Sequence, residues 1–263
     1  MLLAIDIGNT NVVLALLDAE DRVLKERRAP SKDGWTAEQY AAQIRALLCG
    51  RAVRGAAVSS VVPELTGVLS AAAREAAGVT ALVVNSDSPV GLTLAIEQPE
   101  TLGTDILAAD AAAAEEYPLP VIVFDFGTAT TVTVVDEQRR YRGGVILPGI
   151  KLGMQALFTG TAQLPDIRIE APAHVICTET VESLQAGAVY GAAAMTDGLV
   201  ERMESELGRP CTAVVTGGLG RFVVPHCRRR LVYDEHLLLR GLGMIWRRAQ
   251  GEILSCGAMG NAV

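Results

Sequence analysis

Two short polar motifs in the chain follow apolar runs and combine an aspartate, a glycine and a threonine. Asp6-Ile7-Gly8-Asn9-Thr10 ends the first apolar run, and Asp125-Phe126-Gly127-Thr128 ends a similar run about 120 residues later. Glycine lets the backbone come close to an anion, and turn N–H groups and threonine hydroxyls donate hydrogen bonds to phosphate oxygens. The carboxylate of Asp6 can hold Mg²⁺ beside those phosphates. The two motifs therefore predict two phosphate-binding turns.

A third, glycine-rich motif strengthens this prediction. One Asp-x-Gly-x-Thr turn is weak support, because most such turns are plain hairpins. Thr216-Gly217-Gly218-Leu219-Gly220, however, follows a late apolar segment, where a turn with few side chains can lie against a nucleobase or ribose. The nucleotide signatures G-x-x-x-x-G-K-[ST] and G-x-G-x-x-G are missing from the chain. Three turns together favour a nucleotide-binding protein.

The elements that must position these turns follow the same order twice. In each half a buried strand runs into the Asp–Gly turn, two more strands follow, and helices come after them. This repeat indicates two similar lobes, and the break at Tyr117-Pro118 predicts an α/β protein with lobes over residues 1–117 and 118–263. We expect strands over 2–7, 12–18, 22–28, 55–62, 81–85, 121–124, 130–135, 140–147 and 214–215, and helices over 37–48, 65–77, 106–116, 153–158, 181–207 and 237–249.

Composition and charge exclude several classes of protein. Half of the residues are apolar and 20% are charged, which is typical of a packed globular chain and not of a disordered one. The net charge of −7 argues against a nucleic-acid partner, and we interpret Arg228-Arg229-Arg230 as a solvated face. There is no signal-peptide pattern and no apolar run of the roughly 18 residues that a spanning helix needs. We therefore expect a cytoplasmic protein with no membrane partner.

The five cysteines and three histidines are scattered without the spacing of a disulfide framework or a metal site. This usage favours a reducing compartment. The Gly- and Ala-rich stretch Ser255–Val263 is predicted to be a frayed tail.

The three turns and several motifs between them resemble those of the type III pantothenate kinases, a family of the acetate/sugar kinase–Hsp70–actin superfamily. The resemblance covers nearly the whole chain. Besides the three turns it includes Ser59-Ser60-Val61-Val62-Pro63, Gly103-Thr104-Asp105, Gly143-Gly144-Val145-Ile146-Leu147-Pro148-Gly149, Thr161-Ala162-Gln163-Leu164-Pro165 and Ser183-Leu184-Gln185-Ala186-Gly187. It implies two ribonuclease H-like lobes, each with a central mixed sheet, and a nucleotide cleft between them.

The resemblance also implies a reaction and a set of site residues. The reaction would be ATP-dependent phosphorylation of the primary hydroxyl of pantothenate, with Asp105 as general base. Asp125 would bind a monovalent cation, K⁺ or NH₄⁺, and Asp6 would bind Mg²⁺. Members of the family are homodimers with the acceptor site near the interface. The ATP phosphates would meet Asp6, Ile7, Gly8, Asn9, Thr10, Asn11, Val12, Val13 and Thr128, and the acceptor would meet Ile96, Gly103, Thr104, Asp105, Ile106 and Thr180.

Several of these residues also have a purely structural interpretation. Asp105 precedes an Ala-rich helical segment, so its charge could serve only the helix N-terminus. Asp125 could brace its turn, and Thr180 could cap a helix. The pair Gly143-Gly144 could form a hairpin or a bulge.

The chain departs from the family pattern at the acceptor pocket. The family motif Gly-x-Asp-Arg ends here in Ile106, which cannot make the charge-assisted bond that the arginine makes to the pantothenate carboxylate. Ile96, Thr133 and Glu179 stand where the family has Tyr, Asp and Asn. Loss of one such hydrogen-bonded ion pair costs on the order of 1.5–3 kcal/mol of binding free energy.

Three interpretations remain open on the sequence. The chain could be a pantothenate kinase that holds the carboxylate otherwise, for example through Arg142. It could be a kinase of another small alcohol that is neutral or cationic. It could also be a nucleotide-binding regulatory paralogue without turnover. The joint presence of Asp6, Asp105, Asp125 and Thr128 favours a working phosphotransferase.

Overall fold

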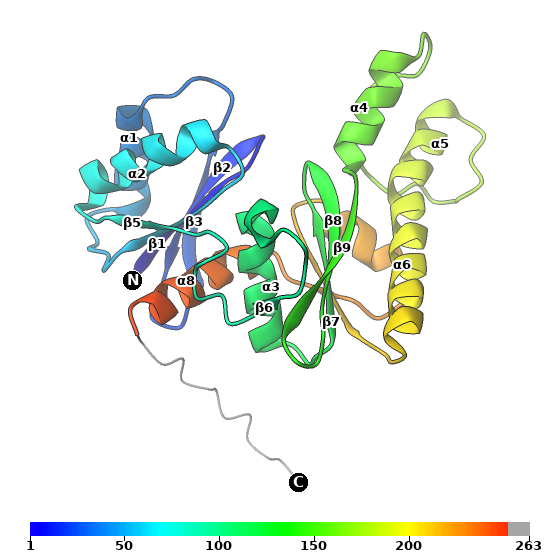
Figure 1. The fold of residues 1–263 in the computed structure, drawn as a ribbon. Coiled ribbons are helices and arrows are strands. Elements are labelled where there is room, and N and C mark those ends of the chain that lie inside the picture. The colour runs from blue at the N-terminus through cyan, green and yellow to red at the C-terminus, as the bar shows by residue number, and fades with distance from the viewer. Residues whose placement is uncertain (252–263) are drawn as a thin grey trace. The chain divides into compact units, whose positions relative to one another are not determined.

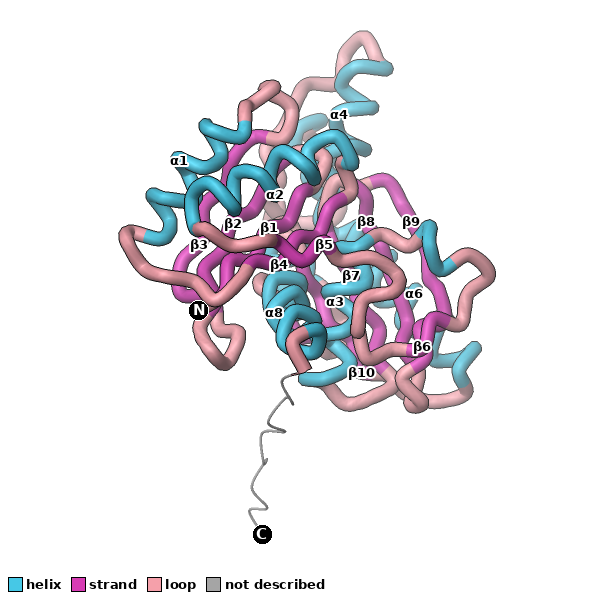
Figure 2. Tube along the Cα trace, turned by 60° about the vertical axis from the view of Figure 1, so that its left-hand side comes forward, coloured by secondary structure: helices cyan, strands magenta, loops and turns pink. Residues whose placement is uncertain are grey.

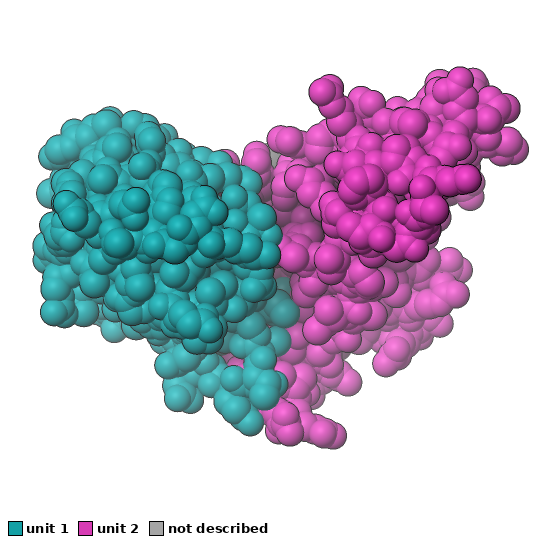
Figure 3. Space-filling view, turned by 90° about the horizontal axis from the view of Figure 1, so that it is seen from above, with its two compact units in different colours: residues 1–91, 100–111, 239–263 teal, residues 92–99, 112–238 magenta. Residues whose placement is uncertain are grey.

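A computed structural model describes residues 1–251 of the chain, so the predicted tail at Ser255–Val263 lies outside the described residues. Contacts between Cα atoms divide the chain into two compact units, which Figure 3 colours separately. Unit 1 contains residues 1–91 and 100–111 and the chain from 239 onward, and unit 2 contains 92–99 and 112–238. This division differs from the predicted boundary at Tyr117-Pro118, because the C-terminal helix packs within unit 1.

Unit 1 is built on a five-stranded mixed sheet with the order β3-β2-β1-β4-β5 (Figure 2). The first strand lies at its centre, antiparallel to β2 and parallel to β4, and its apolar residues are buried because the sheet is covered on both faces. The strands are β1 (Leu2–Ile7), β2 (Asn11–Leu17), β3 (Val23–Pro30), β4 (Ala56–Ser60) and β5 (Ala81–Val83).

Helices α1 (Ala37–Leu48) and α2 (Pro63–Ala77) cover one face of this sheet and share one apolar core with it. A capping box starts α1: the Thr36 hydroxyl accepts from the backbone of Gln39, and the Gln39 side chain accepts from the backbone of Thr36. Proline at the first position starts α2, and Gly78 in the left-handed conformation ends it.

The C-terminal helix α8 (Leu237–Ala249) belongs to unit 1 from residue 239 onward. A β-carbon at Gly241 would overlap the backbone of Ala108, and one at Gly243 would overlap the side chain of Asp21. These two glycines let α8 approach α3 (Thr104–Glu116) and the β2–β3 turn more closely than a larger residue would permit. The predicted bounds of α1 and α8 are confirmed.

Unit 2 is built on a six-stranded mixed sheet with the order β11-β10-β7-β8-β9-β6. The central strand β7 is antiparallel to β8 and parallel to β10, which repeats the arrangement of β1 in unit 1. Sequence reasoning missed the two-residue edge strands β6 and β11. The strands are β6 (Thr93–Leu94), β7 (Val121–Phe126), β8 (Ala129–Val135), β9 (Arg140–Pro148), β10 (Thr212–Thr216) and β11 (Val232–Tyr233).

Every α-helix that lies wholly within unit 2 follows strand β9 in the chain. The predicted helix over 181–207 is in fact interrupted, because a π-helical turn stands between two α-helical segments. The helical elements are α4 (Ile150–Gly160), α5 (Thr180–Ala186), the π turn η2 (Gly187–Gly191), α6 (Ala192–Leu207) and α7 (Gly220–Val223), with the 3₁₀ turns η1 (Pro99–Thr101) and η3 (Val224–His226). In Figure 1, α4 extends away from the end of β9.

The first two strands of the units are duplicates at the level of single residues. β1 and β7 have the same burial pattern, in which every residue is buried except the aspartate at the fifth position. β2 and β8 also share one pattern. In each pair the turn closes by a glycine N–H that donates to a carbonyl at the start of the second strand. The predicted duplication into two similar halves is confirmed.

None of the helices that the structure describes has the length and apolar character needed to cross a membrane. The four cysteines within this part of the chain, Cys49, Cys177, Cys211 and Cys227, carry free thiols.

Candidate active site

The first predicted phosphate turn lies at the end of β1. Asp6 is half-buried and stands in register with Val13 on β2 and Ser59 on β4. The N–H of Gly8 donates to the Asn11 carbonyl at 3.0 Å, and the Ser31 hydroxyl donates to the Gly8 carbonyl at 2.7 Å. Both backbone polar groups of Gly8 are thus hydrogen-bonded, which fixes the conformation of the turn.

The residues of this turn divide into two groups by burial. Asn9, Thr10 and Asn11 are exposed to solvent. Ile7 and Val12 are 0% exposed and belong to the core of unit 1. Only the backbone groups of these two residues can reach a phosphate, which refines the role that the resemblance implies for them.

The second predicted phosphate turn repeats this geometry at the end of β7. Asp125 is half-buried, and it stands in register with Thr131 on β8 and Thr216 on β10. The N–H of Gly127 donates to the Ala129 carbonyl at 3.1 Å, and Thr128 is exposed. Each turn therefore presents a carboxylate and a threonine at the carboxyl end of a central strand, where ligands bind in open α/β sheets.

Two further segments pack on the second turn, and each does so through a glycine. Gly149 is buried at the start of α4, and its N–H donates to the Thr128 carbonyl at 3.2 Å. A β-carbon on Gly149 would overlap the Thr128 carbonyl oxygen and lie 2.6 Å from that of Gly127. Gly217, at a φ of 82°, lies against Asp125 in the same manner. The glycine-rich motif after β10 therefore lies beside the second predicted phosphate turn, and its expected contact with a nucleobase or ribose stays a prediction.

Asp105, the predicted base, occupies the first turn of α3 and is half-buried. Burial raises the pKa of its carboxyl above the ordinary value, although the backbone N–H groups of Ile106 and of Asp105 itself oppose the shift. The Ile106 N–H donates to Oδ1 at 2.9 Å. A partly desolvated carboxylate with a raised pKa suits a general base. The same contact is what a helix N-terminus uses, so the structural interpretation of Asp105 has an observed interaction, and its role as the base stays a prediction.

Thr104, expected to line the acceptor pocket, directs its hydroxyl toward β4. Its Oγ1 accepts from the N–H of Ser60 at 2.8 Å and lies 3.1 Å from the hydroxyl of Ser59 and 3.2 Å from the Ser60 carbonyl. Ser59 was not expected at the site. A fully buried serine beside a candidate aspartate in an apolar strand is the signal that could have indicated it.

The acceptor residues implied by the resemblance are distributed over both units. Gly103, Thr104, Asp105 and Ile106 lie in unit 1 with Asp6, whereas Ile96 and Thr180 lie in unit 2. Ile106 and Ile96 are half-buried, and Thr180 is exposed at the first position of α5. The N-cap of α5 is Glu179 and not Thr180, so the interpretation of Thr180 as a cap is wrong.

Gly143-Gly144 forms a β-bulge, one of its two structural interpretations. Thr133 pairs with Gly144 but Val135 pairs with Tyr141, so β9 contains one extra residue there. Gly143 takes a φ of 95°, and a β-carbon on it would lie 3.8 Å from the Ile96 side chain. Thr133, which stands where the family has Asp, is 4% exposed, so its side chain is part of the interior of unit 2.

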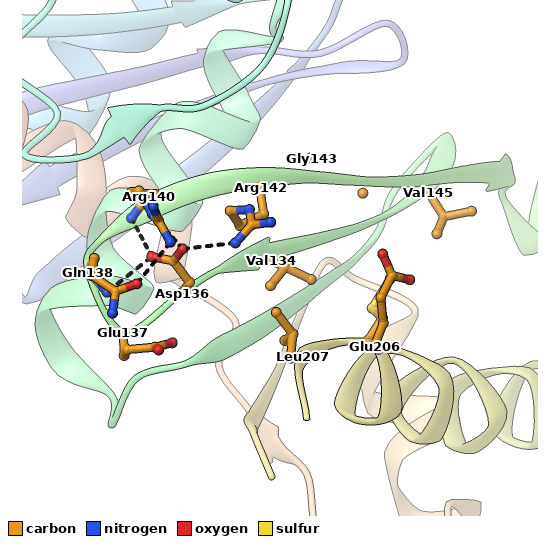
Figure 4. A pocket seen from close by; sticks show the side chains of 12 residues that line it. Val134, Asp136, Glu137, Gln138, Arg140, Arg142, Gly143, Val145, Glu206 and Leu207 are labelled. Atoms are coloured by element: carbon orange, nitrogen blue, oxygen red, sulfur yellow. Dashed lines mark hydrogen bonds and ion pairs between the residues drawn. The ribbon is translucent and has the colours of Figure 1, made fainter. Parts of the chain in front are cut away.

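Arg142 lines a pocket of about 410 Å³ between the β8–β9 hairpin and α6 (Figure 4). Its Nη1 lies 3.3 Å from Oδ2 of Asp136, which also pairs with Arg140 at 2.8 Å. Strand register places Val135 beside Tyr141 at this end of the hairpin and Ala129 beside Pro148 at the other. Arg142 therefore lies about 20 Å along β9 from the second phosphate turn. Because Arg142 lies far from this turn and is already paired with Asp136, it is a poor candidate to replace the family arginine that binds the pantothenate carboxylate.

The residues present fit a metal ion that is shared with a nucleotide. Within residues 1–251 no group of three or more His, Cys, Asp or Glu side chains forms a closed cage. Mg²⁺ commonly binds through one or two carboxylates together with substrate phosphates and water, which needs no such cage. Asp6 and Asp125 each supply a half-buried carboxylate beside a phosphate turn.

Comparison with known proteins gives a consistent answer. A family model described as type III pantothenate kinase matches residues 2–202. A type III pantothenate kinase from an Exiguobacterium species is 36% identical over 95% of this chain and 100% of its own length. Those from Brevibacillus brevis and Myxococcus xanthus are each 38% identical, over 95% and 94% of this chain and 100% and 98% of theirs.

Solved structures show the same fold at low identity. A structure from Campylobacter jejuni, described as a Baf family transcriptional activator, aligns with a TM-score of 0.60 and 20% identity over 95% of this chain and 99% of its own. A ROK family glucokinase from Streptomyces griseus, in complex with glucose and AMPPNP, aligns with a TM-score of 0.52 and 13% identity over 94% of this chain and 99% of its own. The predicted fold class, two ribonuclease H-like lobes of the actin/sugar-kinase type, is confirmed.

Proposed function

The chain belongs to the type III pantothenate kinase family, and from this premise we propose that it phosphorylates the primary hydroxyl of pantothenate, with Asp105 as general base, in the first step of coenzyme A biosynthesis. It is a kinase, and ATP is its phosphoryl donor. The observation that carries the assignment of roles is local to unit 1. There, the first turn of α3 is bonded to the strand that neighbours Asp6, so a candidate base and a phosphate turn belong to one rigid arrangement.

The proposed chemistry needs little from the protein beyond position and charge. Asp105 accepts the proton of the acceptor's primary hydroxyl as the oxygen attacks the γ-phosphorus. Burial keeps its pKa raised, which makes it a better proton acceptor than a solvated aspartate. The exposed Asn9, Thr10 and Thr128 and the backbone N–H groups of both turns hold the phosphate oxygens.

Two cations complete this proposal. Asp6 would hold Mg²⁺ together with the ATP phosphates, and Asp125 would hold K⁺ or NH₄⁺. Each ion neutralises charge on the transferred group or on the turn that carries it. The carboxylates fit these roles because both are half-buried near the end of a strand, in turns that also carry an exposed threonine.

The acceptor is where this chain departs from its family. Ile106 is half-buried directly after the base and carries no charge, and Arg142 is occupied by Asp136. We therefore propose that pantothenate is bound without a strong ion pair to its carboxylate, at the cost of a high KM. A kinase of another small alcohol, neutral or cationic, is the second candidate, and Ile106 is the observation that favours it.

We also propose a cytoplasmic homodimer in which α4 covers part of the partner. None of the residues of α4 is buried, although Leu152, Leu157 and Phe158 are apolar and are 51%, 39% and 43% exposed. Several exposed apolar side chains on one helix favour an interaction surface. Leu157→Glu is expected to give a monomer in light scattering, while Leu24→Glu, at a leucine of β3 that is 49% exposed, leaves the dimer intact.

The assay that tests the function measures ADP release with Mg-ATP and potassium, with and without millimolar pantothenate. Asp105→Asn provides the blank. Pantothenate-dependent release that the variant lacks is the expected result. ATP binding by calorimetry without pantothenate-dependent release would overturn the acceptor assignment and favour another alcohol. Turnover that survives in Asp105→Asn would overturn the role of the base.

A further inference from the structure

The hydroxyl of Thr104 has all the hydrogen bonds that it can make. A threonine hydroxyl donates one hydrogen bond and accepts two. Oγ1 of Thr104 accepts from the Ser60 N–H at 2.8 Å, and its remaining neighbours are the Ser60 carbonyl at 3.2 Å and the Ser59 hydroxyl at 3.1 Å. If Thr104 donates to the carbonyl, Ser59 donates to Thr104, and every position is filled. The hydroxyl has no capacity left for a substrate.

Both partners of Thr104 belong to the end of β4, which runs beside the first phosphate turn. Ser59 is 0% exposed and stands in register with Asp6 on the parallel strand β1. Ser60 follows it and stands in register with Ile7. Thr104 is the first residue of α3, and Asp105 is the second. Within unit 1, Asp6 and Asp105 are therefore linked by the strand pairing of Asp6 with Ser59, the hydrogen bond between Ser59 and Thr104, and the peptide bond from Thr104 to Asp105.

We propose that Thr104, through its hydrogen bonds to Ser59 and Ser60, is a positioning residue that fixes the base Asp105 relative to the first phosphate turn. This rests on the proposed function, since it assumes that Asp105 is the base. The role differs from the one implied by the family resemblance, in which Thr104 touches the acceptor. Ser59 takes part as the buried hydroxyl that joins β4 to α3.

The test compares three variants of the full-length protein. Thr104→Val keeps the shape of the side chain but removes the hydroxyl, and Thr104→Ser keeps the hydroxyl. Thr66→Val is the matched control: Thr66 donates to the side chain of Ser60 at 2.8 Å, so this variant loses a hydroxyl from the same cluster without touching Thr104. Each is measured for kcat, for both KM values and for hydrogen exchange at the start of α3.

Thr104→Val is expected to lower kcat by roughly tenfold to a hundredfold, the size of effect that a small misplacement of a reacting group produces. Its KM for ATP should stay within about twofold, because the turn after Asp6 is unchanged. Thr104→Ser should recover kcat to within about threefold of the parent, and Thr66→Val should behave like the parent. The Leu107 amide, which donates to the Gly103 carbonyl at 3.1 Å, should exchange faster only in Thr104→Val.

Two results would overturn the proposal. An unchanged kcat with a raised KM for the acceptor in Thr104→Val would make Thr104 a contact residue. Equal losses of kcat in Thr104→Val and Thr66→Val would make the cluster merely structural. The exchange measurement separates this proposal from the proposed function. If the parent protein does not phosphorylate pantothenate, only the assignment of the acceptor is refuted. If the exchange rate of the Leu107 amide is unchanged in Thr104→Val, the positioning role of Thr104 is refuted, whatever the acceptor is.

Discussion

Gly217 packs directly against the carboxylate of Asp125. A β-carbon at Gly217 would overlap Oδ1 of Asp125 and lie 2.7 Å from the backbone of Phe126, and the residue has a φ of 82°, where glycine is favoured. The glycine after β10 thus lets one loop touch the turn after β7. This close approach makes the second phosphate turn sensitive to single methyl groups.

Gly217→Ala is expected to destabilise the fold and to weaken ATP binding. The left-handed conformation costs a non-glycine residue roughly 1–2 kcal/mol, and displacement of the Asp125 turn adds to it. Gly218→Ala is the matched control, because a β-carbon there meets no atom within 4 Å and its φ is ordinary. Chemical unfolding and calorimetric ATP titration of the two variants measure the difference. Equal behaviour of both would contradict the described packing.

Gly149→Ala should impair the same turn from its other side. The added methyl group would overlap the Thr128 carbonyl oxygen, so either the turn or the start of α4 must move. We expect a loss of roughly 1–3 kcal/mol in stability and a raised KM for ATP. In Gly153→Ala, within α4, the methyl group meets nothing and should add up to about 1 kcal/mol through helix propensity. Thermal melts and the KM for ATP of Gly149→Ala and Gly153→Ala measure the difference between the two variants.

Asp105 should set the acid limb of the rate profile. Its pKa is raised by burial, so the ionised base is lost at a higher pH than the usual aspartate value of about 3.9 as the pH falls. A raised folded-state pKa means that the folded protein binds more protons than the unfolded chain between the two values, so stability decreases as the pH rises through that window.

Asp105→Asn removes this ionisation. The variant should therefore lose activity by about 10²–10⁴-fold and, at neutral pH, be at least as stable as the parent. Below the unfolded pKa the two proteins should converge in stability. Urea unfolding at several pH values checks this sign, and a variant that is less stable at pH 7 would contradict it.

Ile106→Arg should restore the family's cationic anchor. A charge-assisted bond contributes on the order of 1.5–3 kcal/mol, so KM for pantothenate is expected to fall by tenfold or more while KM for ATP stays unchanged. Ile106→Met keeps the side chain uncharged at similar length and should change neither value much. Steady-state kinetics with both substrates measures the effect. No gain in Ile106→Arg would indicate that the acceptor of this chain is not a carboxylate.

Asp136 should contribute stability that is lost in acid. Burial alone would raise its pKa, but hydrogen bonds from the Arg140 backbone and side chain and from Arg142 outweigh it and hold the pKa below the ordinary value. A lowered folded pKa stabilises the protein above the unfolded value of about 3.9, and this contribution fades as the pH falls from about 5 toward the folded value.

Asp136→Asn is therefore expected to be less stable than the parent at pH 7, with a difference that shrinks in acid. Glu137→Gln, at the exposed neighbouring position, is the control: it removes a surface ion pair with Arg209, so its effect should be small. Unfolding midpoints from pH 7 down to about 3 make the comparison. A penalty that stayed constant over this range would argue against an ionised role for Asp136.

The sequence by itself was sufficient for the repeated units and for the position of the two Asp–Gly turns. Apolar runs that end in Asp-x-Gly report on burial and on a local turn, and both depend only on neighbouring residues. For this reason β1 and β7, with Asp6 and Asp125 at their ends, could be located before the structure was known. Family resemblance added Asp105 and the reaction, which local patterns cannot identify.

Only the tertiary structure decided what packs on these turns. Gly149 and Gly217 belong to motifs that the sequence shows, but their packing role appears only when segments distant in the chain come within a methyl group of Thr128 and Asp125. Likewise Thr104 and Ser59, 45 positions apart, become partners through the packing of α3 on β4. Such contacts arise from long-range packing, whose geometry no local pattern encodes. The sequence therefore determined which reactive side chains are available, and the fold determined which other residues position them.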